Sequence, residues 1–289
     1  MLHKEITKEV CPIPKGILLA IGGAENKGDS PELGSFQEKL QDPERLSILK
    51  LFANELIKKE QKKIEIITTA SSEPKILIKE YKEAFKKLGF EVGHIHHYTR
   101  KEAMENKFIE RIEKADGVLF SGGNQLKLTS HYGGTDILNL LKEKYIYSDF
   151  VIAGTSAGAM ALSTPLIYYG SKETGLLKGA VNICIGLEFI KNVAIDTHFG
   201  QRGRFVRMVQ VIVTNPTCIG IGIEEDTAII IRNGKDIEVC GNGIVVIADG
   251  HSCHHINIAD IGQDEAIEVN DLKVHLLTKK SKYSIPIDL

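Results

Sequence analysis

The stretch Phe150-Val151-Ile152-Ala153-Gly154-Thr155-Ser156-Ala157-Gly158-Ala159-Met160 decides the fold. Its first four residues form a short apolar run, which is typical of a buried strand. A serine between two glycines follows, and small helix-forming residues come next. This is the G-x-S-x-G pattern of a nucleophile elbow, in which a tight strand-to-helix turn exposes the serine hydroxyl. The alternative is a glycine-rich turn with an incidental serine.

The small residues around Ser156 have a physical purpose in such an elbow. The turn is tight, so its neighbours must be small, and Gly154 and Gly158 meet that requirement. The N–H of Ala157 is then placed to bind the oxyanion that forms during acyl transfer. The pattern therefore predicts a serine nucleophile at residue 156.

Length and composition are those of an ordinary globular protein. The chain has 289 residues, of which 43% are hydrophobic and 26% are charged. A net charge of −2 provides no basic field for nucleic acid. No apolar stretch approaches the roughly 20 residues that span a bilayer, and the first residues lack the apolar segment of a secretory signal. We therefore expect a soluble, cytoplasmic protein with no nucleic-acid or membrane partner.

The cysteines agree with a reducing compartment. They are scattered and contain no C-x-x-C pair, which favours free thiols over a disulfide framework. The five residues are Cys11, Cys184, Cys218, Cys240 and Cys253.

Strand and helix patterns alternate through the first half of the chain. Apolar runs at 16–21, 64–68, 117–120 and 150–153 predict buried strands. Helical periodicity lies between them, and Asp42-Pro43-Glu44 is a helix start with a capping residue and a first-turn proline. This alternation predicts βαβ units, and hence one α/β domain over residues 1–289 with a mostly parallel central sheet flanked by helices.

The expected sheet places two motifs at one edge. Ligands bind outside the carboxyl ends of parallel strands, and both Gly122-Gly123 and Ser156 follow strand ends. After Ser156 the pattern becomes mostly strands and turns, at 193–196, 219–223, 228–231, 237–239, 244–248 and 274–277. We therefore expect antiparallel strands added to the sheet in the C-terminal part.

A serine hydroxyl needs a base to take its proton, and the base needs an orienting acid. His198 is the best candidate for the base because it also follows a strand end; the alternative is a surface histidine at a helix start. Glu224, Glu225 and Asp226 follow the strand at 219–223. Alternation places Glu224 and Asp226 on one face and Glu225 on the other, so spacing does not choose among them. A solvated acidic turn is the alternative.

Three arginines follow His198 closely. On a regular helix Arg204 and Arg207 are about 60° apart, whereas Arg202 is about 140° or more from either. All three therefore face one pocket only if the first turn is irregular. Bidentate arginines suit the capture of substrate carboxylates, and Asp196 beside them suits a cationic group. A solvated basic face is the alternative.

Other chemistries have little support in the pattern. The clusters His94-Ile95-His96-His97 and His251-Ser252-Cys253-His254-His255 lack a recognised zinc spacing, so we expect no metal site. Gly22-Gly23 ends a strand but lacks the G-x-G-x-x-G pattern, so we expect no nucleotide site.

Five motifs together resemble the cyanophycinases, serine exopeptidases of the aspartyl dipeptidase family S51. They are residues 16–25 (GILLAIGGAE), 121–125 (SGGNQ), 154–159 (GTSAGA), 196–199 (DTHF) with Arg202, Arg204 and Arg207, and 220–228 (GIGIEEDTA). The resemblance implies a fold like class I glutamine amidotransferases, usually a homodimer, with no metal or organic cofactor. It also implies hydrolysis of cyanophycin, a poly-aspartate bearing arginine on each β-carboxyl, to β-Asp-Arg dipeptides.

Carried to this sequence, the resemblance assigns a role to each matching residue. Ser156 is the nucleophile, His198 the base and Glu225 the orienting acid, and the Gly123 N–H joins that of Ala157 in the oxyanion hole. The substrate-pocket positions are Gln125, Asp196, Thr197, Arg202, Arg204 and Arg207. Thr197 departs from the family, which usually has glutamine there, so the preferred side chain of the β-linked group stays open.

Two other functions are compatible with the same residues. One is an α-aspartyl dipeptidase of the same clan, and the other is a non-catalytic binding protein on the same scaffold. A class I amidotransferase is disfavoured because its elbow carries cysteine, whereas residue 156 is serine.

Overall fold

The computed structural model describes residues 12–23, 25, 46–57 and 63–286. These residues form an eight-stranded sheet in the order β18-β13-β12-β1-β5-β4-β2-β3. The five strands from β1 to β3 in that order are parallel, and β12, β13 and β18 extend the sheet with antiparallel pairings. The prediction of a mostly parallel α/β sheet with antiparallel additions is confirmed.

The strands of this first sheet are β1 (Ile17–Ile21), β2 (Ile64–Ile67), β3 (Val92–Ile95), β4 (Gly117–Phe120), β5 (Val151–Thr155), β12 (Thr227–Arg232), β13 (Asp236–Gly241) and β18 (Lys282–Ser284). The helices are α1 (Ser47–Ile57), α2 (Pro74–Lys87), α3 (Asn106–Glu113), α4 (Gln125–Tyr132), α5 (Asp136–Tyr147), α6 (Ala157–Ala161) and α7 (Phe205–Thr214), with a 3-10 turn at Glu102–Met104. The predicted helix start at residues 42–44 lies outside the described residues.

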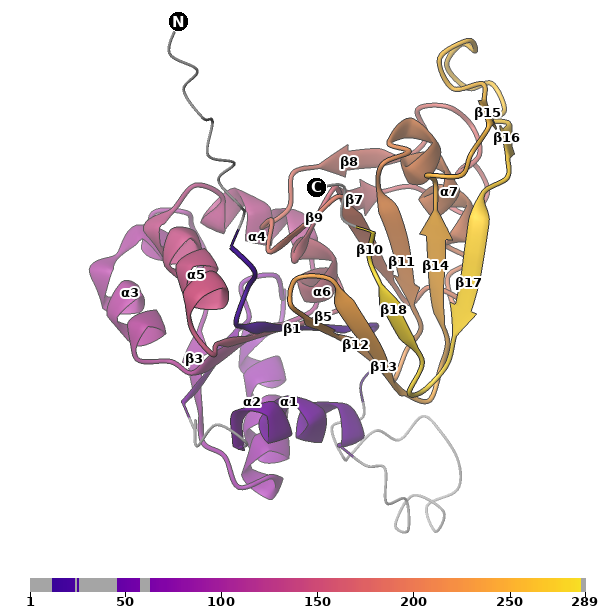
Figure 1. The fold of residues 1–289 in the computed structure, drawn as a ribbon. Helices are drawn as coiled ribbons and strands as arrows, with labels where there is room; N and C mark the ends of the chain where they lie inside the picture. Colours follow the sequence, from indigo (N-terminus) through magenta and orange to yellow (C-terminus); the bar gives the residue numbers. More distant parts are fainter. Residues whose placement is uncertain (1–11, 24, 26–45, 58–62, 287–289) are drawn as a thin grey trace, which may run out of the picture.

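The C-terminal strands do not all join the first sheet. Within the described residues a six-stranded second sheet has the order β17-β14-β11-β10-β6-β9 and stands beside the first (Figure 1). Its strands are β6 (Ser163–Thr164), β9 (Ile190–Lys191), β10 (Val193–Thr197), β11 (Ile219–Ile223), β14 (Val245–Asp249) and β17 (Lys273–Leu277). The described residues also form two small two-stranded antiparallel sheets. One pairs β7 (Leu166–Tyr169) with β8 (Asn182–Cys184), and the other pairs β15 (His255–Ile256) with β16 (Val269–Asn270).

Alternation along β1 separates two apolar clusters. Ile17, Leu19 and Ile21 face helices α1 and α2, whereas Leu18 and Ala20 face the opposite side of the sheet. Figure 1 shows α1 and α2 on one face of the sheet and α3 and α5 on the other. Because both faces are covered, the central strands β1, β4 and β5 are buried at every position rather than alternating with exposed residues.

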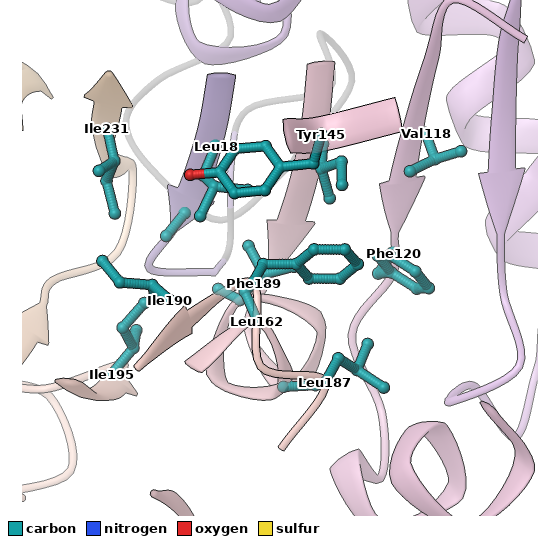
Figure 2. Close-up of a cluster of buried hydrophobic side chains, with 14 of the residues drawn as sticks. Leu18, Val118, Phe120, Tyr145, Leu162, Leu187, Phe189, Ile190, Ile195 and Ile231 are labelled. Carbon is teal, nitrogen blue, oxygen red and sulfur yellow. The ribbon is translucent and has the colours of Figure 1, made fainter. Parts of the chain in front are cut away.

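The second cluster joins the two sheets. It contains Leu18 and Ile231 of the first sheet together with Ile195 of the second. Figure 2 shows these side chains around Phe189 and Leu162, which lie on the connection between the sheets. This shared core holds the ends of β10 and β11 next to those of β1 and β5.

In the described part of the chain, no helix is both long and apolar enough to cross a bilayer.

Candidate active site

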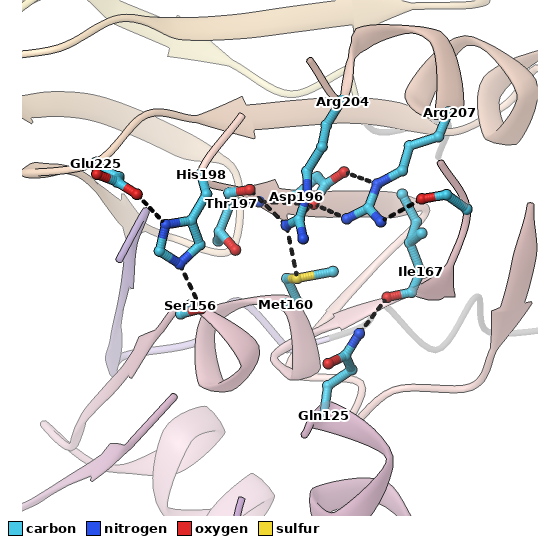
Figure 3. Close-up of polar contacts among 11 residues, drawn as sticks. Gln125, Ser156, Met160, Ile167, Asp196, Thr197, His198, Arg204, Arg207 and Glu225 are labelled. Atoms are coloured by element: carbon cyan, nitrogen blue, oxygen red, sulfur yellow. Dashed lines mark hydrogen bonds and ion pairs between the residues drawn. The ribbon is translucent and has the colours of Figure 1, made fainter. Parts of the chain in front are cut away.

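Three side chains from two sheets form one hydrogen-bonded line (Figure 3). The Ser156 Oγ lies 2.9 Å from His198 Nε2, and His198 Nδ1 lies 2.5 Å from Glu225 Oε1. Ser156 follows β5 of the first sheet, whereas His198 and Glu225 follow β10 and β11 of the second. A hydroxyl, an imidazole and a carboxylate in this order match the arrangement of serine hydrolases.

The turn at Ser156 has the strained geometry expected of an elbow. Ser156 has φ 50° and ψ −116°, a conformation that non-glycine residues rarely adopt. A Cβ added at Gly154 would lie 2.5 Å from the Gly158 backbone, and one added at Gly158 would lie 2.2 Å from the Phe120 carbonyl oxygen. The predicted need for glycine on both sides of the serine is confirmed.

The structure distinguishes among the three acids that follow β11. Glu224 accepts a hydrogen bond from the Ile244 N–H at 2.8 Å, and Asp226 accepts one from the Asn242 amide at 3.0 Å. Glu225 alone of the three contacts His198. Alternation along the strand left this choice open, and the turn after β11 makes it.

The expected oxyanion donors lie on segments that border Ser156. A Cβ at Gly122 would sit 3.3 Å from the Ser156 Cβ, so residues 122 and 123 pass close to the serine. Gly123 has φ +137° and lies against Ala70, where a Cβ would come within 2.1 Å of the carbonyl oxygen. Ala157 is the first residue of α6, and the first N–H groups of a helix have no intrahelical acceptor.

Asp196 forms a buried ion-pair group with two of the arginines. Its side chain is 0% exposed, and its oxygens accept hydrogen bonds from Arg207 Nε at 2.6 Å, Arg207 Nη2 at 2.5 Å and Arg204 Nη1 at 2.9 Å. Asp196 was expected to contact a cationic substrate group. In the structure, its carboxylate is instead paired with the guanidinium groups of Arg204 and Arg207, because the turn after β10 folds back over the strand end.

The three arginines do line one pocket, although a regular helix would not allow it. Helix α7 begins at Phe205, and Arg202 lies in the preceding turn, where its N–H donates to the His198 carbonyl at 3.0 Å. A pocket of about 330 Å³ is lined by Gly170, Ser171, Lys172, Glu173, Arg202, Arg204 and Arg207. Cations outnumber acids in this lining, so the pocket suits an anionic group.

The arginines differ in their availability. Arg207 is tied to Asp196 and to the Gly170 carbonyl, whereas Arg202 is exposed. Arg204 is partly buried and also donates to the Thr197 carbonyl at 2.6 Å. Burial lowers the pKa of Arg204 to about 10, an effect that the Asp196 charge opposes, so Arg204 stays charged at neutral pH.

Two further predicted pocket residues lie near this group. Thr197 is fully buried between the His198 ring and Asp196 (Figure 3), and among the described residues its Oγ1 has no hydrogen-bond partner. Gln125, the first residue of α4, donates from its amide to the Ile167 carbonyl of β7 at 3.1 Å. Gln125 therefore connects α4 to the hairpin that borders the pocket.

Sequence reasoning missed the polar group behind the serine. Glu25 is 5% exposed, and its carboxylate accepts hydrogen bonds from Thr155 Oγ1 at 2.5 Å and from the Tyr81 hydroxyl at 2.7 Å. Burial, together with the nearby Glu25 charge, raises the pKa of Tyr81 well above its usual value. The sequence signal that could have revealed this group is Glu25 itself, an acid two residues after Gly22-Gly23 at a strand end.

The fold is of the class I glutamine amidotransferase type, and a hydroxyl, an imidazole and a carboxylate lie in line where its strands end. Together, the fold and this site define a hydrolase of the peptidase class. The chain belongs to peptidase family S51, whose sequence model matches residues 34–239. A cyanophycinase from Synechococcus elongatus is 28% identical over 273 residues, covering 94% of this chain and 80% of the relative. A cyanophycinase from a Nostoc species is 30% identical over 223 residues, covering 77% of this chain and 75% of the relative.

Solved structures share the fold at lower identity. A peptidase from an acI-B1 actinobacterium superposes with a TM-score of 0.66 at 22% identity, covering 94% of this chain and 98% of that one. A putative peptidase E from Listeria monocytogenes gives a TM-score of 0.51 at 21% identity, covering 78% of this chain and 98% of that one.

Proposed function

We propose that the protein is a serine-type peptidase with Ser156 as its nucleophile. The observation that carries this proposal is the continuous line from Ser156 through His198 to Glu225. His198 takes the serine proton as Oγ attacks the scissile carbonyl, and Glu225 holds the ring and stabilises the imidazolium. The N–H groups of Gly123 and Ala157 bind the oxyanion, and water then releases the acyl group from Ser156.

The proposed substrate is cyanophycin, cleaved at the polymer end to β-Asp-Arg dipeptides. Support comes from the relatives that carry the name cyanophycinase and from the cationic pocket lined by Arg202, Arg204 and Arg207. In this assignment Arg202 and the outer part of Arg204 bind a free carboxylate of the polymer, at the chain end or on an attached arginine. Asp196, which is also paired with Arg207, holds the Arg204 guanidinium in place.

Thr197 is the residue of the site at which this chain departs from its family. The family usually has glutamine here, and threonine is shorter and keeps one hydroxyl. Its buried Oγ1 has no hydrogen-bond partner among the described residues, which is unfavourable by about 1–3 kcal/mol. Thr197→Gln should therefore change the relative rates on polymers with arginine and with lysine side chains more than it changes the rate of serine acylation.

The direct test is incubation with purified cyanophycin, followed by mass analysis of the soluble products. Wild-type protein should release β-Asp-Arg dipeptides, and Ser156→Ala should keep the fold and lose several orders of magnitude in turnover. Ser130→Ala, on the exposed face of α4, is the matched control and should retain the wild-type rate. Undiminished turnover by Ser156→Ala would end the assignment.

Two competing functions give different results in the same assay. An α-aspartyl dipeptidase would cleave Asp-X dipeptides efficiently and leave the polymer intact. A non-catalytic binding protein would bind the polymer, release nothing and leave Ser156 unlabelled by a serine-directed acylating reagent. We further propose a homodimer, which sedimentation of the full chain tests by its mass.

A further inference from the structure

The end of β1 contacts every segment that carries a residue of the hydrogen-bonded line. Three consecutive carbonyl oxygens each accept one backbone N–H from a different segment. The pairs are Ile21 with Ser156 (3.0 Å), Gly22 with His198 (2.9 Å), and Gly23 with Asp226, the residue after Glu225 (3.1 Å). One short segment therefore sets the positions of three backbones that are far apart in the sequence.

The segment also touches the reactive side chains. Gly23 lies directly against the His198 imidazole, where an added Cβ would come within 2.4 Å of both Cε1 and Nε2. Two residues later, the Glu25 carboxylate binds the hydroxyl of Thr155, the residue before Ser156. The segment thus limits where the imidazole and the elbow can lie.

The residues held by these bonds have unfavourable backbone conformations. Ser156, His198 and Asp226 all have positive φ, at 50°, 48° and 48°. Such conformations persist only where the surrounding structure over-determines them. The carbonyls of Ile21, Gly22 and Gly23 supply that constraint, since each accepts the N–H of one of these strained residues.

We propose that Ile21, Gly22, Gly23 and Glu25, here called the β1-end segment, are a positioning element that assembles the line from Ser156 to Glu225. Its carbonyls hold the three turns, Gly23 supplies a surface without a side chain for the imidazole, and Glu25 anchors the elbow through Thr155. The proposal rests on the proposed serine chemistry, and it adds residues that act on the reaction without contacting substrate.

The first test compares two glycines with similar backbone strain. Gly23 has φ +101° and Gly89 has φ +82°, but an added Cβ at Gly89, after α2, meets nothing within 4 Å. Ala at either position is therefore conformationally unfavourable, whereas only Gly23→Ala displaces the His198 ring. The readout is the rate at which a serine-directed acylating reagent labels Ser156, which needs no particular peptide substrate.

We expect Gly23→Ala to label about 10²-fold more slowly, because a displacement of about 1 Å has that effect on positioned groups. The midpoint of its pH–rate profile should also move, since the imidazole no longer keeps its contact with Glu225. Gly89→Ala should keep the wild-type rate and midpoint. A wild-type rate and midpoint in folded Gly23→Ala would overturn the proposal.

The second test removes only the Glu25 contact and does not depend on glycine. Thr155→Val is nearly isosteric and loses the hydroxyl, whereas Thr155→Ser keeps it. We expect slower labelling in Thr155→Val and recovery in Thr155→Ser; equal rates in the two variants would show that the Glu25 contact does not position the elbow. If wild-type protein itself is not labelled, the proposed serine chemistry fails before any variant is made, so the two failures are distinguishable.

Discussion

Replacing Asp196 with asparagine tests whether this carboxylate is part of the scaffold or a substrate ligand. The carboxylate is 0% exposed and accepts three hydrogen bonds from Arg204 and Arg207, whose side chains are 14% and 6% exposed. Asparagine removes the charge and places an amide N–H₂ next to guanidinium donors. Two buried cations then lack a counter-charge.

The expected loss follows from the chemistry of buried ion pairs. Removing one partner of a buried pair typically lowers the free energy of unfolding by about 3–5 kcal/mol, because the remaining charge is left uncompensated. Asp196 serves two cations, so we expect Asp196→Asn to lie in the upper part of that range. Urea unfolding followed by circular dichroism measures the change.

Two comparisons make this prediction specific. Asp260→Asn changes the same chemical group at an exposed position and should stay within about 0.5 kcal/mol of the wild type. The double variant Asp196→Asn with Arg207→Gln should lose less than the sum of the single variants, since it removes one of the uncompensated charges. If Asp196→Asn loses less than about 1 kcal/mol and only raises KM, Asp196 is a substrate ligand and the reasoning is refuted.

Three further variants test other parts of the structure. His97 is 1% exposed, and burial lowers its pKa from 6.5 to about 4. As pH falls, the unfolded chain therefore binds the proton before the folded protein does. About 3 kcal/mol of stability is lost between pH 6.5 and pH 4. His97→Leu should flatten that part of the stability–pH curve, and an unchanged slope would contradict the lowered pKa of His97. Gly158→Ala places a Cβ 2.2 Å from the Phe120 carbonyl, so thermal unfolding should show a loss of about 1–3 kcal/mol together with slower labelling of Ser156. Phe85→Ala empties a fully buried site beside Phe52 and should lower the urea stability by about 3–5 kcal/mol while wild-type labelling is kept.

The sequence alone was enough for most strands of the parallel part of the first sheet and for the elbow. The apolar run before Gly154, the alternation of strand and helix patterns and the small residues around Ser156 are local signals, and each depends on residues close together in the chain. The motifs at 16–25, 121–125, 154–159, 196–199 and 220–228 also identified the family, because five short patterns in register are unlikely to coincide by chance. His198 could be selected from the sequence because it also follows a predicted strand end.

Only the tertiary structure decided which groups meet. It brought Glu225 to His198, a choice that spacing left open and that only the family resemblance made. It also placed β10 and β11 in a second sheet and paired Asp196 with Arg204 and Arg207. It also placed the end of β1 against all three turns of the site. Apart from the pairs of Asp196 with Arg204 and Arg207, these contacts join residues tens to hundreds of positions apart, and no local periodicity records which distant strand end a carbonyl or a carboxylate will face.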